Sequence, residues 1–391
     1  MQRKQAIWTQ PLIFLALAIF FIRLGEGLQG GVATNFFVQD LKLGGDRILW
    51  LSGIREIPGL LLVFLATLLA WLPLPRQATL AVALMAIGYG SYGLVHSYTA
   101  LIAASLVASV GFHNWLPLQS SLSMCLVSKS HSGRIMGRMG AIGAFAALGG
   151  MSLVALLVKQ LGLRMFFFLA GIALVIGTAM VFRLPVGLGR DQGETRKPVF
   201  KRRYWLYYVL IFFEGSRTQV FHAFGSWVLA QFYGVDAQRL SLLMIVTGLV
   251  NLVGSPRLGA WIDRFGERTV LIICYLGLAL SFAGYAVIHN VWILSALYIT
   301  FNFLVYSRVA LDTYANRMAL PGDLVPTLTA GVSVNHITSV SMSLAAGTLL
   351  QIVGYEALCW GAAAMILLSV PFACMVRIPK EHRPAEAAAA D

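Results

Sequence analysis

The sequence has few charged residues, and their scarcity decides its broad class. Only 12% of the 391 residues are Asp, Glu, Lys or Arg, whereas 58% are hydrophobic. A soluble domain keeps about 25% charged residues. The composition therefore excludes an ordinary soluble domain and predicts an all-α polytopic membrane protein.

Paired cysteines and catalytic motifs are also missing. The four cysteines lack the CxxC spacing of metal or redox sites, so we expect buried free thiols at Cys125, Cys274, Cys359 and Cys374. The sequence has no HExxH metal motif, no GxSxG elbow and no phosphate-cradling loop. We therefore expect no enzyme, no cofactor and no metal. An integral-membrane enzyme and an ion channel remain the alternatives from other classes.

Long apolar segments are what the chain does have. A membrane-spanning helix needs about 20 mostly apolar residues. Twelve segments meet that rule. They run near residues 12–38, 48–72, 77–97, 98–126, 135–158, 164–183, 204–232, 240–262, 269–289, 291–316, 327–351 and 356–377.

The basic residues orient these segments. With the N-terminus inside, 20 of the 29 Lys and Arg fall on the cytoplasmic side, 5 outside and 4 within spans. Cytoplasmic loops carry this excess in membrane proteins. The pattern places both termini in the cytoplasm and explains the net charge of +13 without a nucleic-acid partner. Short loops favour a monomer in a bacterial inner membrane, in contact with lipids.

The spans divide into two similar halves. The longest polar stretch, 184–203, lies midway and is rich in basic residues. Short sequence echoes recur at an offset near 190 residues, for example around Glu26 and Glu214. We expect two six-helix bundles, 1–183 and 204–378, joined by a cytoplasmic basic linker, 184–203, and followed by a disordered tail, 379–391.

The loop after the eighth span carries the most specific motif. It reads Gly-Ala-Trp-Ile-Asp-Arg-Phe-Gly-Glu-Arg over residues 259–268. This resembles the cytoplasmic G-x-x-x-D-R-x-G-x-R signature of the major facilitator superfamily. The resemblance implies a gate formed by Gly259, Asp263, Arg264, Gly266 and Arg268. Asp263 is expected at a helix N-terminus, with Arg264 and Arg268 pairing across the gate.

The chain departs from the family pattern elsewhere. The equivalent first-half loop, residues 72–76, has lost the signature. The fifth span is rich in glycines that we expect to pack helices closely: Gly133, Gly137, Gly140, Gly143, Gly149 and Gly150. It lacks the Gly-Pro element of the family's drug–proton antiporters.

Eight charges lie within the apolar segments, in four sequence-local pairs. Each costs about 2.5 to 3.5 kcal/mol near a bilayer centre, so they need partners or water. Residues three or four apart share a helix face. We therefore expect Arg23 to pair with Glu26 and Glu214 with Arg217, whereas Arg308 and Asp312 form a gate or a surface pair. Arg55 and Glu56 are adjacent and point about 100° apart.

These groups and nearby polar residues form the expected pathway for solute and protons. It comprises Arg23, Glu26, Arg55, Glu56, His113, Asn114, Glu214, Arg217, His222, Arg308, Asp312, Asn335 and His336. A carboxylate beside a cation can exchange a proton, and imidazole titrates near neutrality. The resemblance then implies secondary transport of a small polar or charged solute by alternating access, coupled to protons. The alternative within transporters is a multidrug/proton antiporter that exports amphiphilic compounds.

Overall fold

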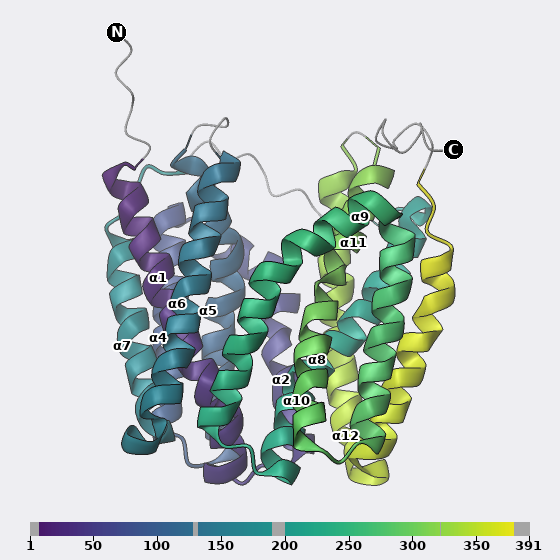
Figure 1. The fold of residues 1–391 in the computed structure, drawn as a ribbon. Helices are drawn as coiled ribbons and strands as arrows, with labels where there is room; N and C mark the ends of the chain where they lie inside the picture. The colour runs from purple at the N-terminus through teal and green to yellow at the C-terminus, as the bar shows by residue number, and fades with distance from the viewer. Residues whose placement is uncertain (1–7, 128–131, 190–199, 321, 379–391) are drawn as a thin grey trace. The chain divides into compact units, whose positions relative to one another are not determined.

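The computed structural model describes residues 8–127, 132–189, 200–320 and 322–378, and within them it is built from helices without strands (Figure 1). The helices are α1 Gln10–Asn35, α2 Gly45–Leu60, α3 Leu62–Leu68, α4 Leu74–Ser91, α5 Tyr98–Cys125, α6 Ser132–Leu161, α7 Leu163–Phe182, α8 Trp205–Tyr233, α9 Ala237–Val287, α10 Val291–Leu304, α11 Arg308–Met318 and α12 Leu324–Cys374. The central part of the expected linker, 190–199, and the expected tail, 379–391, lie outside the described residues.

Two glycines break the longest helices. Gly266 has φ 78° inside α9, and Gly354 has φ 77° inside α12. Because L-residues with a side chain rarely adopt positive φ, each glycine turns the chain and separates two helical segments. The apolar segments predicted on either side of these glycines are therefore distinct helices.

Within the described residues, seven helical stretches have the length and hydropathy of membrane spans. They are 10–40, 98–125, 132–161, 163–182, 237–287, 291–318 and 324–374. The stretches 237–287 and 324–374 each contain a glycine break. α8 is long enough to span a bilayer but carries Glu214 and Arg217 on buried positions. The chain is thus a helical, multi-pass membrane protein.

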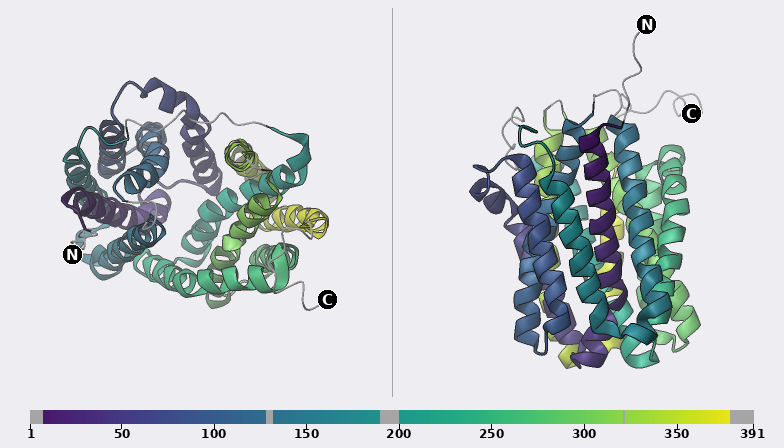
Figure 2. Two further views of the ribbon diagram at one scale, coloured as in Figure 1. Left: turned by 90° about the horizontal axis from the view of Figure 1, so that it is seen from above. Right: turned by 90° about the vertical axis from the view of Figure 1, so that its left-hand side faces the viewer.

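The chain forms two compact units. Unit 1 consists of Met1–Leu43, Ile54–Gly193 and Val235–Ile245, and unit 2 consists of Gly44–Gly53, Glu194–Gly234 and Val246–Asp391. In unit 1, α1 lies between α6 and α7, and α4 packs on α5 and α7 (Figure 2). In unit 2, α8 packs chiefly on α12 and also contacts α10 and α11.

Two helices are divided between the units. The first turns of α9 belong to unit 1 and the rest of α9 to unit 2, whereas the first turns of α2 belong to unit 2 and the rest of α2 to unit 1. The beginning of α9 packs in unit 1, where Asn35 Nδ2 donates to the Val235 carbonyl at 2.9 Å and Ser241 Oγ donates to the Gly31 carbonyl at 3.1 Å. Side chains that pair with backbone carbonyls satisfy polar groups in a region where water is scarce.

Unit 2 holds the beginning of α2 in the same manner. Gln351 Nε2 donates to Asp46 Oδ2 at 2.6 Å, and Gln219 Nε2 donates to Ser52 Oγ at 2.8 Å. The polar residues at the ends of α2 and α9 therefore fix which unit each segment joins.

Only some of the α6 glycines produce the close helix packing that the sequence predicts. A Cβ on Gly150 would lie 2.5 Å from the Leu24 carbonyl oxygen and 2.8 Å from the Leu28 amide nitrogen of α1. Gly143 lies against Arg23. The other four, Gly133, Gly137, Gly140 and Gly149, have no described atom within 4 Å of the place that a Cβ would take, and they stand on open faces of α6. For those four, the packing prediction was wrong.

We expect Gly150→Val to destabilise the protein strongly and Gly149→Val to have little effect. Both changes place the same β-branched residue in the middle of α6, so the intrinsic helix cost is shared. Only the first forces a side chain into the α1 backbone, which costs about 1 to 3 kcal/mol or more. Thermal unfolding of the two purified variants measures the difference. Equal melting temperatures would show that α1 and α6 do not meet at Gly150.

Candidate functional site

Glu214 on α8 is a buried acid of unit 2 with partners on several helices. Only 3% of its side chain is exposed. Arg308 Nη1 of α11 donates to its Oε2 at 3.0 Å, and Asn335 Nδ2 of α12 donates to the same oxygen. Thr218, one turn along α8, donates to Oε1 at 3.2 Å. Three helices therefore converge on one carboxylate.

This arrangement corrects two pairings predicted from local spacing. The expected partner of Glu214 was Arg217, but the carboxylate meets Arg308 instead. Arg308 was expected to pair with Asp312 at a gate or a surface, yet it reaches into the interior of unit 2 while Asp312 is exposed. Arg308 starts α11 directly after a 3-10 turn at Val305–Ser307.

Arg217 is buried beside Glu214 but has different neighbours. Arg217 is 4% exposed, and its guanidinium carbon lies 4.1 Å from the centre of the Tyr275 ring. A cation over an aromatic face is attracted by the ring quadrupole. Its Nε and Nη1 atoms have no hydrogen-bond partner among the described residues.

In unit 1 the predicted pair of Arg23 and Glu26 forms. Arg23 Nη1 donates to Glu26 Oε2 at 2.7 Å along one turn of α1. The second carboxylate oxygen, Oε1, is buried without a hydrogen-bond partner among the described residues. The carboxylate therefore keeps an unused acceptor on a mostly buried side chain.

A second polar group of unit 1 joins α2 and α5. Glu56 Oε2 lies 3.6 Å from His113 Nε2, and His113 Nδ1 lies 3.0 Å from Ser109 Oγ. Arg55 points elsewhere, with Nη2 3.5 Å from the Tyr89 hydroxyl of α4. The adjacent charges thus face different helices, as expected from their spacing. The carboxylate, imidazole and hydroxyl form a short chain of groups that can pass a proton.

The remaining predicted pathway residues lie on α5, α8 and α12. Asn114 donates to the Val110 carbonyl of its own helix at 2.8 Å, so its amide nitrogen serves α5 itself. His222 is exposed on α8, and His336 is half-buried on α12 directly after Asn335. Asn335 joins the buried charges through its hydrogen bond to Glu214.

The predicted gate loop is organised by a residue that the motif does not contain. Arg317, at the end of α11, places Nη2 3.1 Å from Asp263 Oδ1 and Nη1 3.1 Å from Glu267 Oε1. Asp263 lies before the Gly266 break rather than at a helix N-terminus, which corrects that expectation. The tight turn expected at Gly266 is present.

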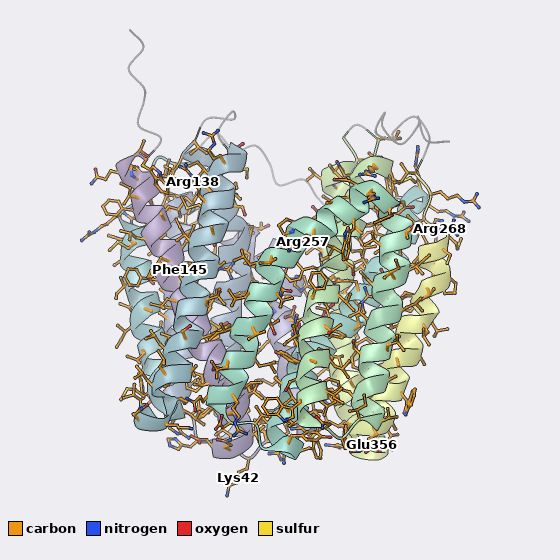
Figure 3. The ribbon with its side chains drawn as sticks, in the orientation of Figure 1. Lys42, Arg138, Phe145, Arg257, Arg268 and Glu356 are labelled. Carbon is orange, nitrogen blue, oxygen red and sulfur yellow. The ribbon has the colours of Figure 1, made fainter. Side chains whose placement is uncertain are left out.

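The other motif residues are on the surface. Arg264 lies over the ring of its neighbour Phe265 at 5.2 Å, and Arg268 is exposed at the end of unit 2 opposite to Glu356 (Figure 3). Gly259 has no described atom near the place that a Cβ would take. Arg264 and Arg268 therefore make no ion pair within the described residues, whereas Arg317 pairs with Asp263 and Glu267.

Glu267 is the residue that sequence reasoning overlooked. Its side chain is fully buried and ion-paired with Arg317. A signal was available in the spacing. Val270, Leu271 and Cys274 follow it at helical intervals and are all buried, so Glu267 continues the inward face of its helix. An acid on an apolar helix face needs a cation nearby.

A third ionic contact fixes the segment that leads into α8. Lys201 Nζ donates to Asp323 Oδ1 at 2.7 Å, and the Tyr204 hydroxyl donates to Asp323 Oδ2 at 2.9 Å. These hydrogen bonds, the one from Lys201 first, lower the pKa of the Asp323 carboxyl below its usual value, because they favour the ionised form. The contact stabilises this end of unit 2 above the pKa of the carboxyl and is lost as the pH falls through it.

Comparison with known proteins finds a family match in the second half of the chain. Residues 208–391 match the sequence profile described as Major Facilitator Superfamily. This region contains the Glu214 cluster and the gate loop. The match covers just under half of the chain. This match points to a transporter rather than an enzyme.

Individual relatives agree with the assignment. The tetracycline resistance protein of class E from Escherichia coli is 30% identical over 88 residues, which is 22% of this chain and 22% of that protein. The nucleoside transporter NupG has a TM-score of 0.79 at 14% identity, covering 95% of this chain and 100% of that one. A bacterial homologue of the iron transporter ferroportin has a TM-score of 0.76 at 13% identity, covering 93% and 98%. At such low identity, these two structures show a shared fold alone.

We expect Arg317→Met to destabilise the protein by about 3 kcal/mol, since it leaves the buried Glu267 carboxylate without its cation. Arg268→Met removes an exposed arginine of the same loop and should change stability by no more than about 0.5 kcal/mol. Thermal unfolding in detergent compares the two. If both variants melt with the wild type, the Arg317 contacts contribute nothing to the fold.

Proposed function

We propose that the chain is a secondary transporter that moves a small polar or charged solute by alternating access, coupled to protons. The observation that carries the proposal is the Glu214 cluster. Its carboxylate is buried, whereas 35% of the Arg308 side chain that holds it is exposed. In such a pair, the accessible Arg308 can leave the shielded carboxylate and bind a solute instead.

The cluster suggests how proton and solute could compete. A proton on Glu214 would weaken its hydrogen bond with Arg308, because charge-assisted hydrogen bonds are about twice as strong as neutral ones. Arg308 would then be free to bind an anionic or strongly polar group of the solute. The Asn335 amide, which also donates to Glu214, could turn to the same group. Loss of the proton would restore the original pair and release the solute.

Unit 1 offers two further proton-exchanging groups. Glu26 has one oxygen on Arg23 and one buried oxygen without a hydrogen bond among the described residues. Glu56 lies within 3.6 Å of His113. We propose that Glu26 acts in coupling and that the Glu56–His113 pair relays protons. Arg55, Asn114, His222 and His336 are proposed as polar lining of the same pathway.

The topology in the membrane completes the proposal. We propose twelve spans in two six-helix halves, 1–183 and 204–378, joined by a basic cytoplasmic linker, with both termini in the cytoplasm of a bacterial inner membrane. The monomer would contact lipids and no nucleic acid. Asp263 and the motif residues around Gly266 would form a cytoplasmic gate, which Arg317 holds in place through its ion pairs with Asp263 and Glu267.

The tetracycline resistance protein supports a second candidate. Its 30% identity over 88 residues favours a multidrug/proton antiporter that exports amphiphilic compounds. The two candidates share the proton-coupled cluster and differ in solute. Tetracycline transport without transport of polar solutes would select the antiporter.

We expect Glu214→Gln and Glu26→Gln each to abolish uphill transport, because neither amide can exchange a proton. Proteoliposomes with an imposed pH gradient would be supplied in turn with a radiolabelled nucleoside and with tetracycline, two solutes named by the relatives. Wild-type protein should accumulate at least one of them, and the variants should only equilibrate it.

Glu356→Gln is the matched control for this experiment. Glu356 pairs with His289 on an exposed surface, with 55% of its side chain accessible, so its variant should accumulate solute like the wild type. Wild-type accumulation by the Glu214 and Glu26 variants would reject coupling through these carboxylates.

A further inference from the structure

Unit 2 contains an apolar cavity of about 210 Å³ beside α8. It is bordered by α8, by the second segment of α9 and by both segments of α12, with Val220, Phe282, Met342 and Met365 in its wall. Among the described residues, Ser216 and Arg217 supply the only strongly polar side chains of the lining. Ser216 already donates its hydroxyl to the Phe213 carbonyl at 2.8 Å.

Arg217 is therefore the polar group of the wall with unused hydrogen-bonding capacity. Its residue is 4% exposed, and its Nε and Nη1 atoms have no partner among the described residues. Tyr275 places the centre of its ring 4.1 Å from the guanidinium carbon and also hydrogen-bonds to Arg217, which leaves Nε and Nη1 without a partner among the described residues. A buried arginine in this condition is unfavourable unless an anion reaches it.

The neighbouring acid on α8 does not supply that anion. Glu214 lies three residues away, and both of its oxygens are in use. Oε2 accepts from Arg308 and Asn335, and Oε1 accepts from Thr218. Arg308 and Asn335 do not border the cavity. The cavity is thus a site separate from the Glu214 cluster, although it lies one helical turn away.

The cavity also has a way in and a definite size. Leu349 and Gly361, one on each segment of α12, border it and are exposed at the surface of the chain. A volume of 210 Å³ holds about seven water-sized groups at about 30 Å³ each. Its occupant must combine a short apolar body with an anionic head.

We propose that this cavity binds a small anionic amphiphile, with a carboxylate or phosphate head on Arg217 and an apolar body between α8, α9 and α12. The guanidinium binds either head through paired N–H donors. The head can belong to a soluble medium-chain carboxylate or to an anionic phospholipid. This site goes beyond the proposed transport function, since it needs neither the Glu214 cluster nor a pH gradient.

The test uses the full chain in nanodiscs of phosphatidylcholine, with octanoate as the probe because its tail matches the cavity. We expect octanoate to raise the melting temperature, and octanol, which lacks the charge, to act far more weakly. Loss of a charge-assisted hydrogen bond should weaken octanoate binding about tenfold or more in Arg217→Met. Arg257→Met, an exposed arginine of α9 that does not border the cavity (Figure 3), should bind like the wild type.

A second variant and a second lipid make the test decisive. Ala362→Phe fills the cavity from its α12 wall and keeps Arg217, so it should lose octanoate binding even if Arg217→Met fails to fold. In nanodiscs containing phosphatidylglycerol, competition with octanoate would identify the lipid as the occupant, and its absence would identify a soluble carboxylate. Equal octanoate binding by the wild type and Ala362→Phe, or equal binding of octanoate and octanol, would overturn the proposal.

Discussion

The carboxylate of Glu214 is the group on which the arrangement of unit 2 depends. A charge in an apolar helix bundle is tolerated only where other groups solvate it. Arg308 and Asn335 do so from two other helices, which ties α8, α11 and α12 to one point. The same requirement makes the site chemically useful. A carboxylate that accepts several hydrogen bonds changes these contacts when it takes up a proton. Because the donors lie on different helices, protonation alters the contacts of each of those helices.

Polar contacts also set the limits of each unit. Glu267 is buried against Arg317 next to the Gly266 turn, and Gln351 holds the start of α2 through Asp46. Hydrogen bonds and ion pairs between polar groups are directional, whereas contacts between apolar side chains are not. They therefore determine which segments join which unit, while close glycine contacts such as Gly150 against α1 set the helix spacing.

The sequence predicts the helices well because their signal is local. Apolar runs and the glycines at 266 and 354 mark where helices lie and turn, and the motif around Asp263 points to the family. Partners of buried charges were predicted less well. Helical spacing predicts Arg217 as the partner of Glu214, but the partner is Arg308, 94 residues later in the chain. No local sequence pattern shows that the helix carrying Arg308 packs near Glu214. Arg317 was missed for the same reason, at 54 residues from Asp263.

A double-mutant cycle between Glu214 and Arg308 tests the central claim most directly. Stabilities of Glu214→Gln, Arg308→Met and the double variant give the coupling free energy of the pair. We predict coupling of about 1.5 kcal/mol or more, as expected for a hydrogen bond between charged groups, and a clearly smaller value for Glu214 with Arg217. Additivity within about 0.5 kcal/mol for Glu214 and Arg308 would contradict the account.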